Sequence, residues 1–223
     1  MISKEKKFIF IHNFKTGGTS IEYKLGHFET LERDVQDHRT IREIELLTNR
    51  KHFLRMTFYA LKIGKPKRAM FYFKNFYAPV LTKSEYDSFF KFTFVRSTWA
   101  RVYSWYANVM QDDVLRKSYH IEDSEYSFKD FLTEKLNHKT YSLLHFLKDS
   151  KGDIPMDFIG RFENLQEDFN SISKTLGLED GTLPKLLVRN RKHYTDFYTE
   201  ETKSMVYQFY KEEIEYFGFK YGE

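Results

Sequence analysis

The chain of 223 residues contains no cysteine, so it has neither disulfides nor thiolate metal sites. Proline is scarce, with four residues, and no Pro- or Ser-rich linker interrupts the chain. No apolar run approaches the ~20 residues needed to cross a bilayer, and the N-terminal apolar stretch is too short for the core of a signal peptide. These absences, together with the length, predict a single domain, 1–223, in the cytoplasm.

Aromatic residues are abundant, with 23 Phe and 16 Tyr, which indicates a well-packed globule rather than a disordered chain. Apolar runs predict strands at about 8–12, 91–95 and 156–160. Helical periodicity predicts helices at about 18–27, 98–111, 163–176 and 200–214, the last capped by Thr199. This alternation predicts an α/β fold, with a P-loop-like parallel sheet flanked by helices on both faces.

The first predicted strand runs into a short loop of lysine, glycine and hydroxyl residues: Lys15, Thr16, Gly17, Gly18, Thr19 and Ser20. Glycine lets a ligand approach the backbone, and the start of a helix offers unpaired N–H groups that favour an anion. The common nucleotide loop G-x-x-x-x-G-K-[ST] has its lysine after the last glycine, whereas Lys15 precedes both glycines. The loop therefore predicts a phosphate or sulfate site unlike that of ATP or GTP enzymes, with an ordinary Gly-Gly turn as the alternative.

A second segment, 90–106, repeats the pattern of a buried strand followed by a helix. Arg96 falls at the end of the strand and Ser104 on the helix. A guanidinium and a hydroxyl suit a terminal phosphate, which arginine binds through two parallel hydrogen bonds. Because ligands of such sheets bind beyond the carboxyl ends of the strands, we expect Lys15 and Arg96 to lie at one site.

These segments resemble the cofactor-binding segments of sulfotransferases that use 3′-phosphoadenosine 5′-phosphosulfate (PAPS). Residues 11–20 are similar to the family's I-H-x-P-K-T-G-G-T-S, and 92–106 to F-x-F-V-R-N-P-W-D-R-x-x-S-x-Y of the carbohydrate branch. Residues 157–165 and the tail, 193–219, resemble the third block and the usual ending of that branch. The four blocks occur in the family's order and span nearly the whole chain.

The resemblance implies a role for each matching residue. Lys15 would be the cation at the leaving oxygen, assisted by the loop residues Thr16, Gly17, Gly18, Thr19 and Ser20. Arg96 and Ser104 would hold the 3′-phosphate, and Arg191 and Lys192 would belong to a basic loop over the nucleotide. Sulfuryl transfer of this kind needs no metal, and no carboxylate pair suited to magnesium is evident in the sequence.

The sequence departs from the family pattern at three places. Phe14 replaces the proline of the first loop, which changes the rigidity expected of the turn. Ser97 and Thr98 replace an Asn-Pro pair, and we expect Thr98 to cap the following helix instead. Ala100 replaces an aspartate, which removes a carboxylate that could have held Arg101 or the loop, and so affects the expected positioning of the acceptor or the stability there.

Two residues are candidates for the general base. His38 resembles a histidine found between the first two blocks in similar proteins, and Asp37 or another neighbouring carboxylate could tune it. Glu22 stands on the helix after the loop, although a glutamate there is more often exposed. His12 ends the first strand and is expected to be a packed, hydrogen-bonded residue. Arg161 and Glu163 are expected to form an ion pair, with Glu163 in a structural role.

Acidic residues are missing from the segment between Leu46 and Ser84, which contains nine basic residues among many Phe and Tyr. We interpret 46–84 as an insertion that is a solvated basic face, an acceptor-binding region for an anionic or glycan-like molecule, or a contact with an anionic membrane surface. The chain's net charge of +4 is too small to indicate nucleic-acid binding.

The sequence thus predicts a sulfotransferase that transfers a sulfuryl group from PAPS to a hydroxyl of a carbohydrate or glycosylated small molecule, leaving 3′-phosphoadenosine 5′-phosphate. Two alternatives remain open. One is a P-loop kinase, which the position of Lys15 and the lack of an apolar strand ending in aspartate disfavour. The other is a non-catalytic nucleotide-binding or membrane-associated adaptor.

Overall fold

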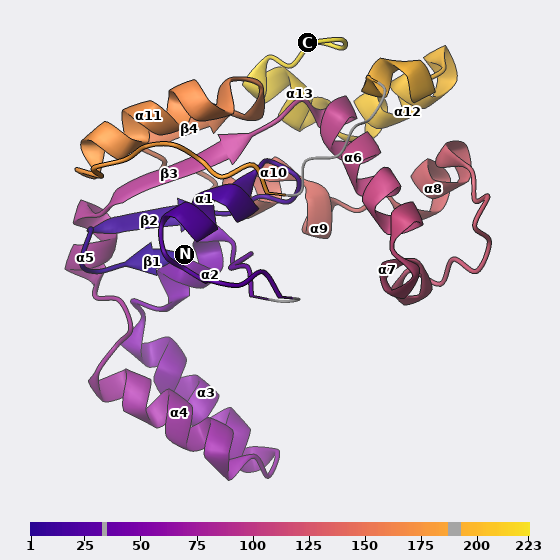
Figure 1. Ribbon diagram of the computed structural model, residues 1–223. Helices are drawn as coiled ribbons and strands as arrows, with labels where there is room; N and C mark the ends of the chain where they lie inside the picture. The colour runs from indigo at the N-terminus through magenta and orange to yellow at the C-terminus, as the bar shows by residue number, and fades with distance from the viewer. Residues whose placement is uncertain (33–34, 187–192) are drawn as a thin grey trace. The chain divides into compact units, whose positions relative to one another are not determined.

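The computed structural model describes residues 1–32, 35–186 and 193–223. Its sheet has four strands in the order β1 (Ile2–Ser3), β2 (Phe8–Ile11), β3 (Phe90–Val95), β4 (Phe158–Arg161). Strand β1 runs antiparallel to β2, with Ile2 opposite Ile9 and Ser3 opposite Phe8 (Figure 1). The α/β class is confirmed, and the sheet, expected to be parallel, is mixed because the two-residue strand β1 folds back on β2.

The strands are where continuous apolar runs indicated them, within two residues at each end. All four residues of β2 are buried, as are Phe92, Phe94 and Val95 of β3, which fits strands covered on both sides. Phe92 stacks on Phe10, with 5.0 Å between ring centroids. The long apolar side chains of these strands form the core beside which the loop begins.

The chain divides into two compact units, and the division falls within β3, α10 and β4. Unit 1 comprises residues 1–11, 37–92 and 146–158; unit 2 comprises 12–36, 93–145 and 159–223. The helices of unit 1 are α2 (Ile41–Leu46), α3 (Arg50–Lys62), α4 (Pro66–Tyr77) and α5 (Lys83–Ser88). Those that lie in unit 2 or begin there are α1 (Gly18–Lys24), α6 (Thr98–Gln111), α7 (Asp113–Ser118), α8 (Phe128–Lys135), α9 (His138–Tyr141), α10 (Leu143–Leu147), α11 (Leu165–Thr175), α12 (Glu200–Phe209) and α13 (Lys211–Phe217). Short 3-10 turns cover Phe162–Asn164 and Tyr194–Phe197.

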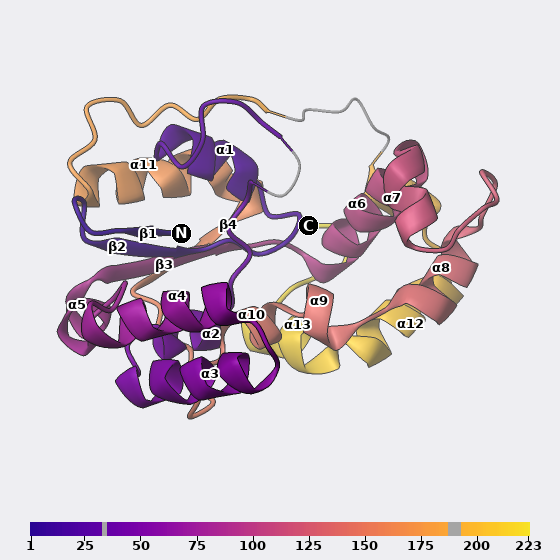
Figure 2. The ribbon, with the colours of Figure 1, turned by 90° about the horizontal axis from the view of Figure 1, so that it is seen from below.

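The segment between the two predicted cofactor blocks is helical. Capping boxes begin α2 and α5, in which Thr40 pairs with Glu43 and Thr82 with Glu85. Between these helices, α3 and α4 form an antiparallel hairpin, seen side by side in Figures 1 and 2. Gly64, with φ of 68°, reverses the chain between them. The sequence pattern had indicated neither helix.

The predicted helices of unit 2 are present, with corrections at their ends. Helix α6 covers 98–111 as expected, and α12 is capped by Thr199, whose hydroxyl accepts from Thr202 N. Helix α1 ends three residues early, at Lys24, because Gly26 takes φ of 76°. The helix expected at 200–214 is two helices, since buried Tyr210 leaves helical geometry, with φ of −110° and ψ of 24°. Among the described residues, no helix has the length and apolarity needed to cross a membrane.

Candidate functional site

The loop after β2 has the backbone of an anion-binding turn. Lys15 and Gly17 both take left-handed conformations, with φ of 64° and 80°. Gly17 is the N-cap of α1 and has no side chain with which to cap the helix, and the first turn carries no acidic residue. The N–H groups of this first turn therefore find no acceptor in the side chain of the N-cap residue, and backbone N–H groups at the start of a helix favour a phosphate or sulfate oxygen.

The two glycines are required by their surroundings as well as by the turn. A Cβ on Gly17 would lie 2.9 Å from Leu165 Cδ2 and would need a positive φ. A Cβ on Gly18 would lie 2.0 Å from the ring of His12. The backbone thus rests directly on side chains, and only glycine fits at either position.

His12 and Glu22 form a buried pair against which the loop packs. His12 is 3% exposed and Glu22 is fully buried, with 3.3 Å between His12 Nδ1 and Glu22 Oε1. The expectation that His12 is packed is confirmed, and the expectation of an exposed Glu22 is wrong, because the helix turns this side chain inward. The pair fixes the ring on which Gly18 packs.

Asn13 and Thr16 hold the start of the loop. Buried Asn13 donates from Nδ2 to Thr93 Oγ1 at 2.8 Å and to Phe94 O at 3.0 Å. The Thr16 hydroxyl is fully buried and donates to Asn13 O at 2.9 Å, so its side chain serves the loop itself. Thr19 is half-buried and Ser20 is buried on the first turn of α1. In the sequence, the signal that could have identified Asn13 was a polar amide close to the end of an apolar strand.

Phe14 occupies the place of the family's proline. Its ring packs on Tyr141, with 5.4 Å between centroids and an interplanar angle of 41°. A proline would restrict φ through its ring; here an aromatic contact fixes the same position of the chain. The departure from the family pattern therefore leaves the turn anchored.

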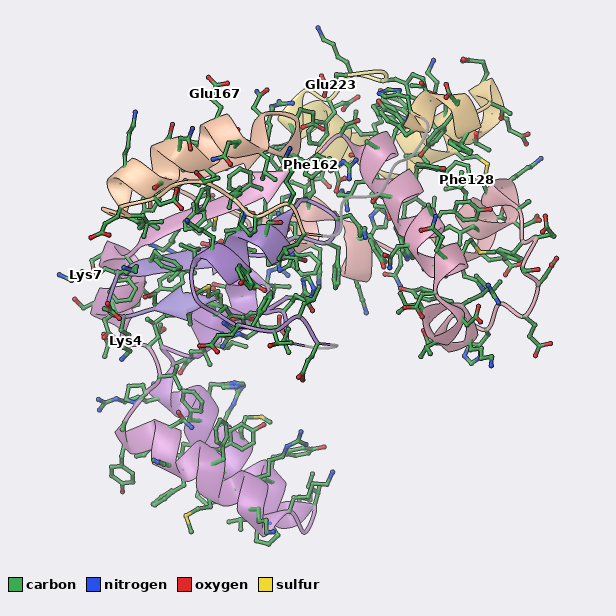
Figure 3. The ribbon with its side chains drawn as sticks, in the orientation of Figure 1. Lys4, Lys7, Phe128, Phe162, Glu167 and Glu223 are labelled. Atoms are coloured by element: carbon green, nitrogen blue, oxygen red, sulfur yellow. The ribbon has the colours of Figure 1, made fainter. Side chains whose placement is uncertain are left out.

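Arg96 lies against this loop. Its Nη1 donates to Lys15 O at 3.3 Å, and its guanidinium carbon lies 4.0 Å from the centroid of the Phe162 ring. Phe162 is labelled in Figure 3, where the chain leaves β4. Ser104 is half-buried on α6, six residues beyond Thr98 and so about 9 Å further along the helix axis. The structure thus brings Lys15 and Arg96 together, with Ser104 on the helix that follows Arg96.

Glu163 supports the beginning of α6. Its Oε1 accepts a hydrogen bond from Ser97 N at 3.1 Å, which satisfies a backbone donor at the helix N-terminus. The expected ion pair between Arg161 and Glu163 is wrong, because Arg161 donates to Phe217 O at 2.6 Å and pairs with Glu223. Thr98 is also not the cap: Ser97 is, and Thr98 opens the helix.

A buried carboxylate from the tail holds Arg101, the residue that follows Ala100. Glu213 of α13 accepts from Arg101 Nη2, from Thr98 Oγ1 at 2.8 Å and from Leu143 N at 2.7 Å. Arg101 and Glu213 are each 1% exposed, and Arg101 also donates to Tyr141 O. Burial raises the pKa of the Tyr141 phenol well above its usual value, so this ring stays neutral beside the pair. A glutamate on the buried face of the last helix was the available signal.

The remaining predicted residues are His38, Arg191 and Lys192. His38 is half-buried in unit 1, outside the unit that carries the loop. The neighbouring carboxylate of Asp37 accepts from Arg39 Nε at 2.8 Å and lies 2.9 Å from the Met1 amino group. Burial alone would raise the pKa of Asp37, but these cations hold it well below its usual range. Arg191 and Lys192 lie outside the described residues.

Within the described ranges, no group of three or more His, Asp or Glu side chains is arranged to hold a metal ion. The loop and Arg96 supply backbone N–H groups, hydroxyls and two cations, which suit an anion, while the carboxylate of Glu22 is buried against His12.

Comparison with known proteins identifies the family. A model of the sulfotransferase family matches residues 1–220. The chain belongs to the sulfotransferase family. A protein of Archaeoglobus fulgidus described as uncharacterized is 31% identical over 98 residues, which cover 44% of this chain and 76% of that protein. No solved structure matches the chain. Membership of this family supports sulfuryl transfer as the general chemistry of the protein.

Proposed function

We propose that this sulfotransferase uses PAPS as donor and transfers its sulfuryl group to a hydroxyl of a carbohydrate or a glycosylated small molecule. One observation carries the proposal: Arg96 donates to the carbonyl of Lys15 at 3.3 Å, so the two predicted anion-binding segments meet. A donor with phosphate groups at both ends, such as PAPS, makes use of both segments. The glycines of the loop support the same donor, because without a Cβ Gly17 and Gly18 pack directly on Leu165 and His12, which holds the N–H groups of the turn in place.

In the proposed reaction, the acceptor hydroxyl oxygen attacks sulfur in line and forms a new S–O bond. The bond between sulfur and the bridging oxygen of the 5′-phosphate breaks, and its electron pair stays on that oxygen. Lys15 and the N–H groups of Gly17, Gly18 and Thr19 stabilise this developing charge, with Ser20 on the same turn. Groups fixed in advance are effective here because they need not reorganise during the reaction.

Arg96 and Ser104 bind the 3′-phosphate in this proposal, and Arg191 and Lys192 add positive charge to the nucleotide site. Phe162 holds the guanidinium of Arg96 from one face, which reduces the freedom that arginine loses on binding. Glu163 supports the same segment through Ser97 N. A 3′-phosphate is therefore the chemical group by which the protein would distinguish its donor from AMP or ADP.

The acceptor proton passes to a base, for which we propose His38. Glu22 was the second candidate, and its full burial against His12 favours a positioning role beneath the loop. The two assignments give different results. His38→Ala lowers turnover and leaves nucleotide affinity unchanged, whereas Glu22→Gln weakens nucleotide binding because the loop loses its support.

The donor is tested by calorimetry with 3′-phosphoadenosine 5′-phosphate, with AMP as the ligand that lacks only the 3′-phosphate. We expect Arg96→Ala to weaken binding of the bisphosphate by about 1.5–3 kcal/mol, the usual contribution of hydrogen bonds to charged groups, and to leave AMP binding nearly unchanged. Arg116→Ala is the matched control, since Arg116 pairs with Asp113 on α7. Equal affinity for AMP, or preference for ATP with magnesium, would overturn the proposal.

Transfer itself is tested by incubating the protein with PAPS and a panel of glycans, and detecting an added SO₃ group by mass spectrometry. Lys15→Ala abolishes transfer if the mechanism holds, because the leaving oxygen loses its cation. Lys6→Ala, at an exposed lysine of unit 1, is the control. Transfer at the wild-type rate by the Lys15 variant would remove Lys15 from the mechanism.

A further inference from the structure

The hairpin formed by α3 and α4, residues 50–77, exposes apolar side chains to an unusual extent. Met70 is 69% exposed, Phe58 64% and Phe71 57%, and the other exposed members are Tyr59, Leu61, Ile63, Phe73 and Tyr77. Figure 3 shows side chains projecting from both helices of the hairpin. Single exposed apolar residues are ordinary, but a gathering of this size on one element marks an interaction site.

The two helices leave their outer faces bare because only a few of their side chains are buried. The buried residues of the hairpin are Phe53, Thr57, Ala60, Ala69 and Asn75. Thr57 and Asn75 satisfy their polar groups within their own helices, by donating to Phe53 O and Phe71 O. The two helices pack chiefly on each other within the described part of unit 1, so the opposite faces remain available.

Basic side chains lie on the same outer faces as the apolar ones. On α3 the outer positions recur at helical spacing as Lys51, Arg55, Phe58 and Lys62. On α4 they recur as Lys67, Met70, Lys74 and Tyr77. Long basic side chains can lay their carbon stems on an apolar layer while the charge stays in water.

The charge of the hairpin is not neutralised within the described chain. Residues 50–77 contain eight Lys and Arg and no Asp or Glu. The chain's net charge is +4, so all other residues together carry −4. No ion pair joins any of these eight side chains to a described residue. The hairpin is therefore a cationic element on a chain that is otherwise acidic.

We propose that the α3–α4 hairpin binds the surface of an anionic phospholipid bilayer, with its outer faces at the level of the headgroups. A helix pair with Phe, Met, Leu and Ile beside Lys and Arg is typical of segments that lie in this interface, because the apolar groups enter the acyl boundary and the cations contact the headgroups. An acidic polysaccharide would satisfy the charges but would leave Met70, Leu61 and Ile63 in water. The inference is independent of the proposed donor and acceptor.

Co-sedimentation with vesicles tests the proposal. We expect binding to vesicles of phosphatidylcholine mixed with phosphatidylserine, and none to phosphatidylcholine alone. The double variant Lys67→Glu/Lys74→Glu lowers the partition coefficient by about 10-fold or more, since each basic residue near such a surface contributes on the order of 1 kcal/mol, or about fivefold. The matched control is Lys151→Glu/Lys220→Glu, at two exposed lysines outside the hairpin, which should stay within about threefold of wild type.

The apolar contribution distinguishes a bilayer from an acidic polymer. Met70→Gln/Phe71→Gln leaves the charge unchanged and should still lower vesicle binding by about 10-fold. The control is Val114→Gln/Tyr216→Gln, at residues that are each 57% exposed outside the hairpin, and it binds as wild type. Unchanged vesicle binding by the hairpin variant, or tighter binding of the wild type to heparin than to the vesicles, would overturn the proposal.

The absence of native cysteine allows a direct probe of insertion. A polarity-sensitive dye attached through Met70→Cys should shift its emission to the blue when anionic vesicles are added. The same dye attached through Lys151→Cys should not shift. A shift at both positions or at neither would contradict the proposed orientation.

Discussion

The loop at 12–20 and the α3–α4 hairpin both combine cations with apolar neighbours in the sequence, but the structure treats them differently. In the loop, His12, Asn13 and Thr16 are buried and hydrogen-bonded or ion-paired, and the backbone is held for a ligand. In the hairpin, the apolar and basic side chains point outward from two helices that bury only a narrow seam. A fixed array of donors suits one small anion, whereas an adaptable exposed face suits an extended surface.

Breaking the buried network around Glu213 should have the largest effect. Glu213→Ala leaves Arg101 charged and buried without its carboxylate, and it removes the acceptor of Thr98 and Leu143. We expect a loss of about 3–5 kcal/mol in the free energy of unfolding, measured with urea. Glu215→Ala, at an exposed glutamate of the same helix, should cost less than about 0.5 kcal/mol. A similar cost for both variants would contradict the role of Glu213.

Two glycine substitutions compare the loop with the hairpin directly. Gly18→Ala forces the His12 ring to move, and we expect a cost of about 3 kcal/mol together with loss of nucleotide binding. Gly64→Ala meets no atom within 4 Å and carries only the strain of φ at 68°, about 1 kcal/mol. Urea unfolding and calorimetry measure both effects. Retained nucleotide affinity in the Gly18 variant would show that the loop at 12–20 is not the binding site.

Local patterns in the sequence predicted the loop and the strands that precede Lys15 and Arg96 because each is specified within a few residues. The apolar runs gave β2 and β3, and the Thr199 cap gave the start of α12. Helix α6 was predicted at its full length because Trp99, Val102, Tyr103, Tyr106 and Val109 recur on one face. These are short-range signals that tertiary contacts reinforce.

Features that depend on distant partners could not be predicted in this way. Arg101 pairs with Glu213, more than a hundred residues away, and Arg161 pairs with Glu223 rather than Glu163. The break between α12 and α13 falls at Tyr210, a buried residue with non-helical φ and ψ, and no glycine or proline marks it in the sequence. Helices α3 and α4 are amphipathic like the helices that were predicted, but their segment was interpreted from its basic and aromatic composition and not from its helical periodicity.

Asp37 of unit 1 is paired with Arg39 and the Met1 amino group. It therefore contrasts with the Lys and Arg side chains of the hairpin, which form no ion pair with a described residue. Its pKa is lowered in the folded protein from an ordinary value of 3.8, so it stabilises the fold above that pH and the contribution is lost as the pH falls below it. We expect Asp37→Asn to cost about 2 kcal/mol at pH 7 and to cost less in acid, measured by urea unfolding at both pH values. Asp87→Asn, at an exposed pair with Lys83, is the control. A cost that does not change with pH would contradict the pairing.

The smallest effect on the free energy of unfolding is expected for Phe58, on the outer face of α3, where the effect on the proposed membrane contact is large. Phe58→Ser removes a ring that is 64% exposed, and surface substitutions usually change the free energy of unfolding by less than about 0.5 kcal/mol. The fully buried Phe94 gives the contrast, because Phe94→Ala should cost about 3–5 kcal/mol. If the exposed ring of Phe58 does not stabilise the fold, it is available for a contact with a bilayer. If Phe58→Ser destabilised the protein by several kcal/mol, the ring would be part of the core, and the outer face of α3 would not be available to a bilayer.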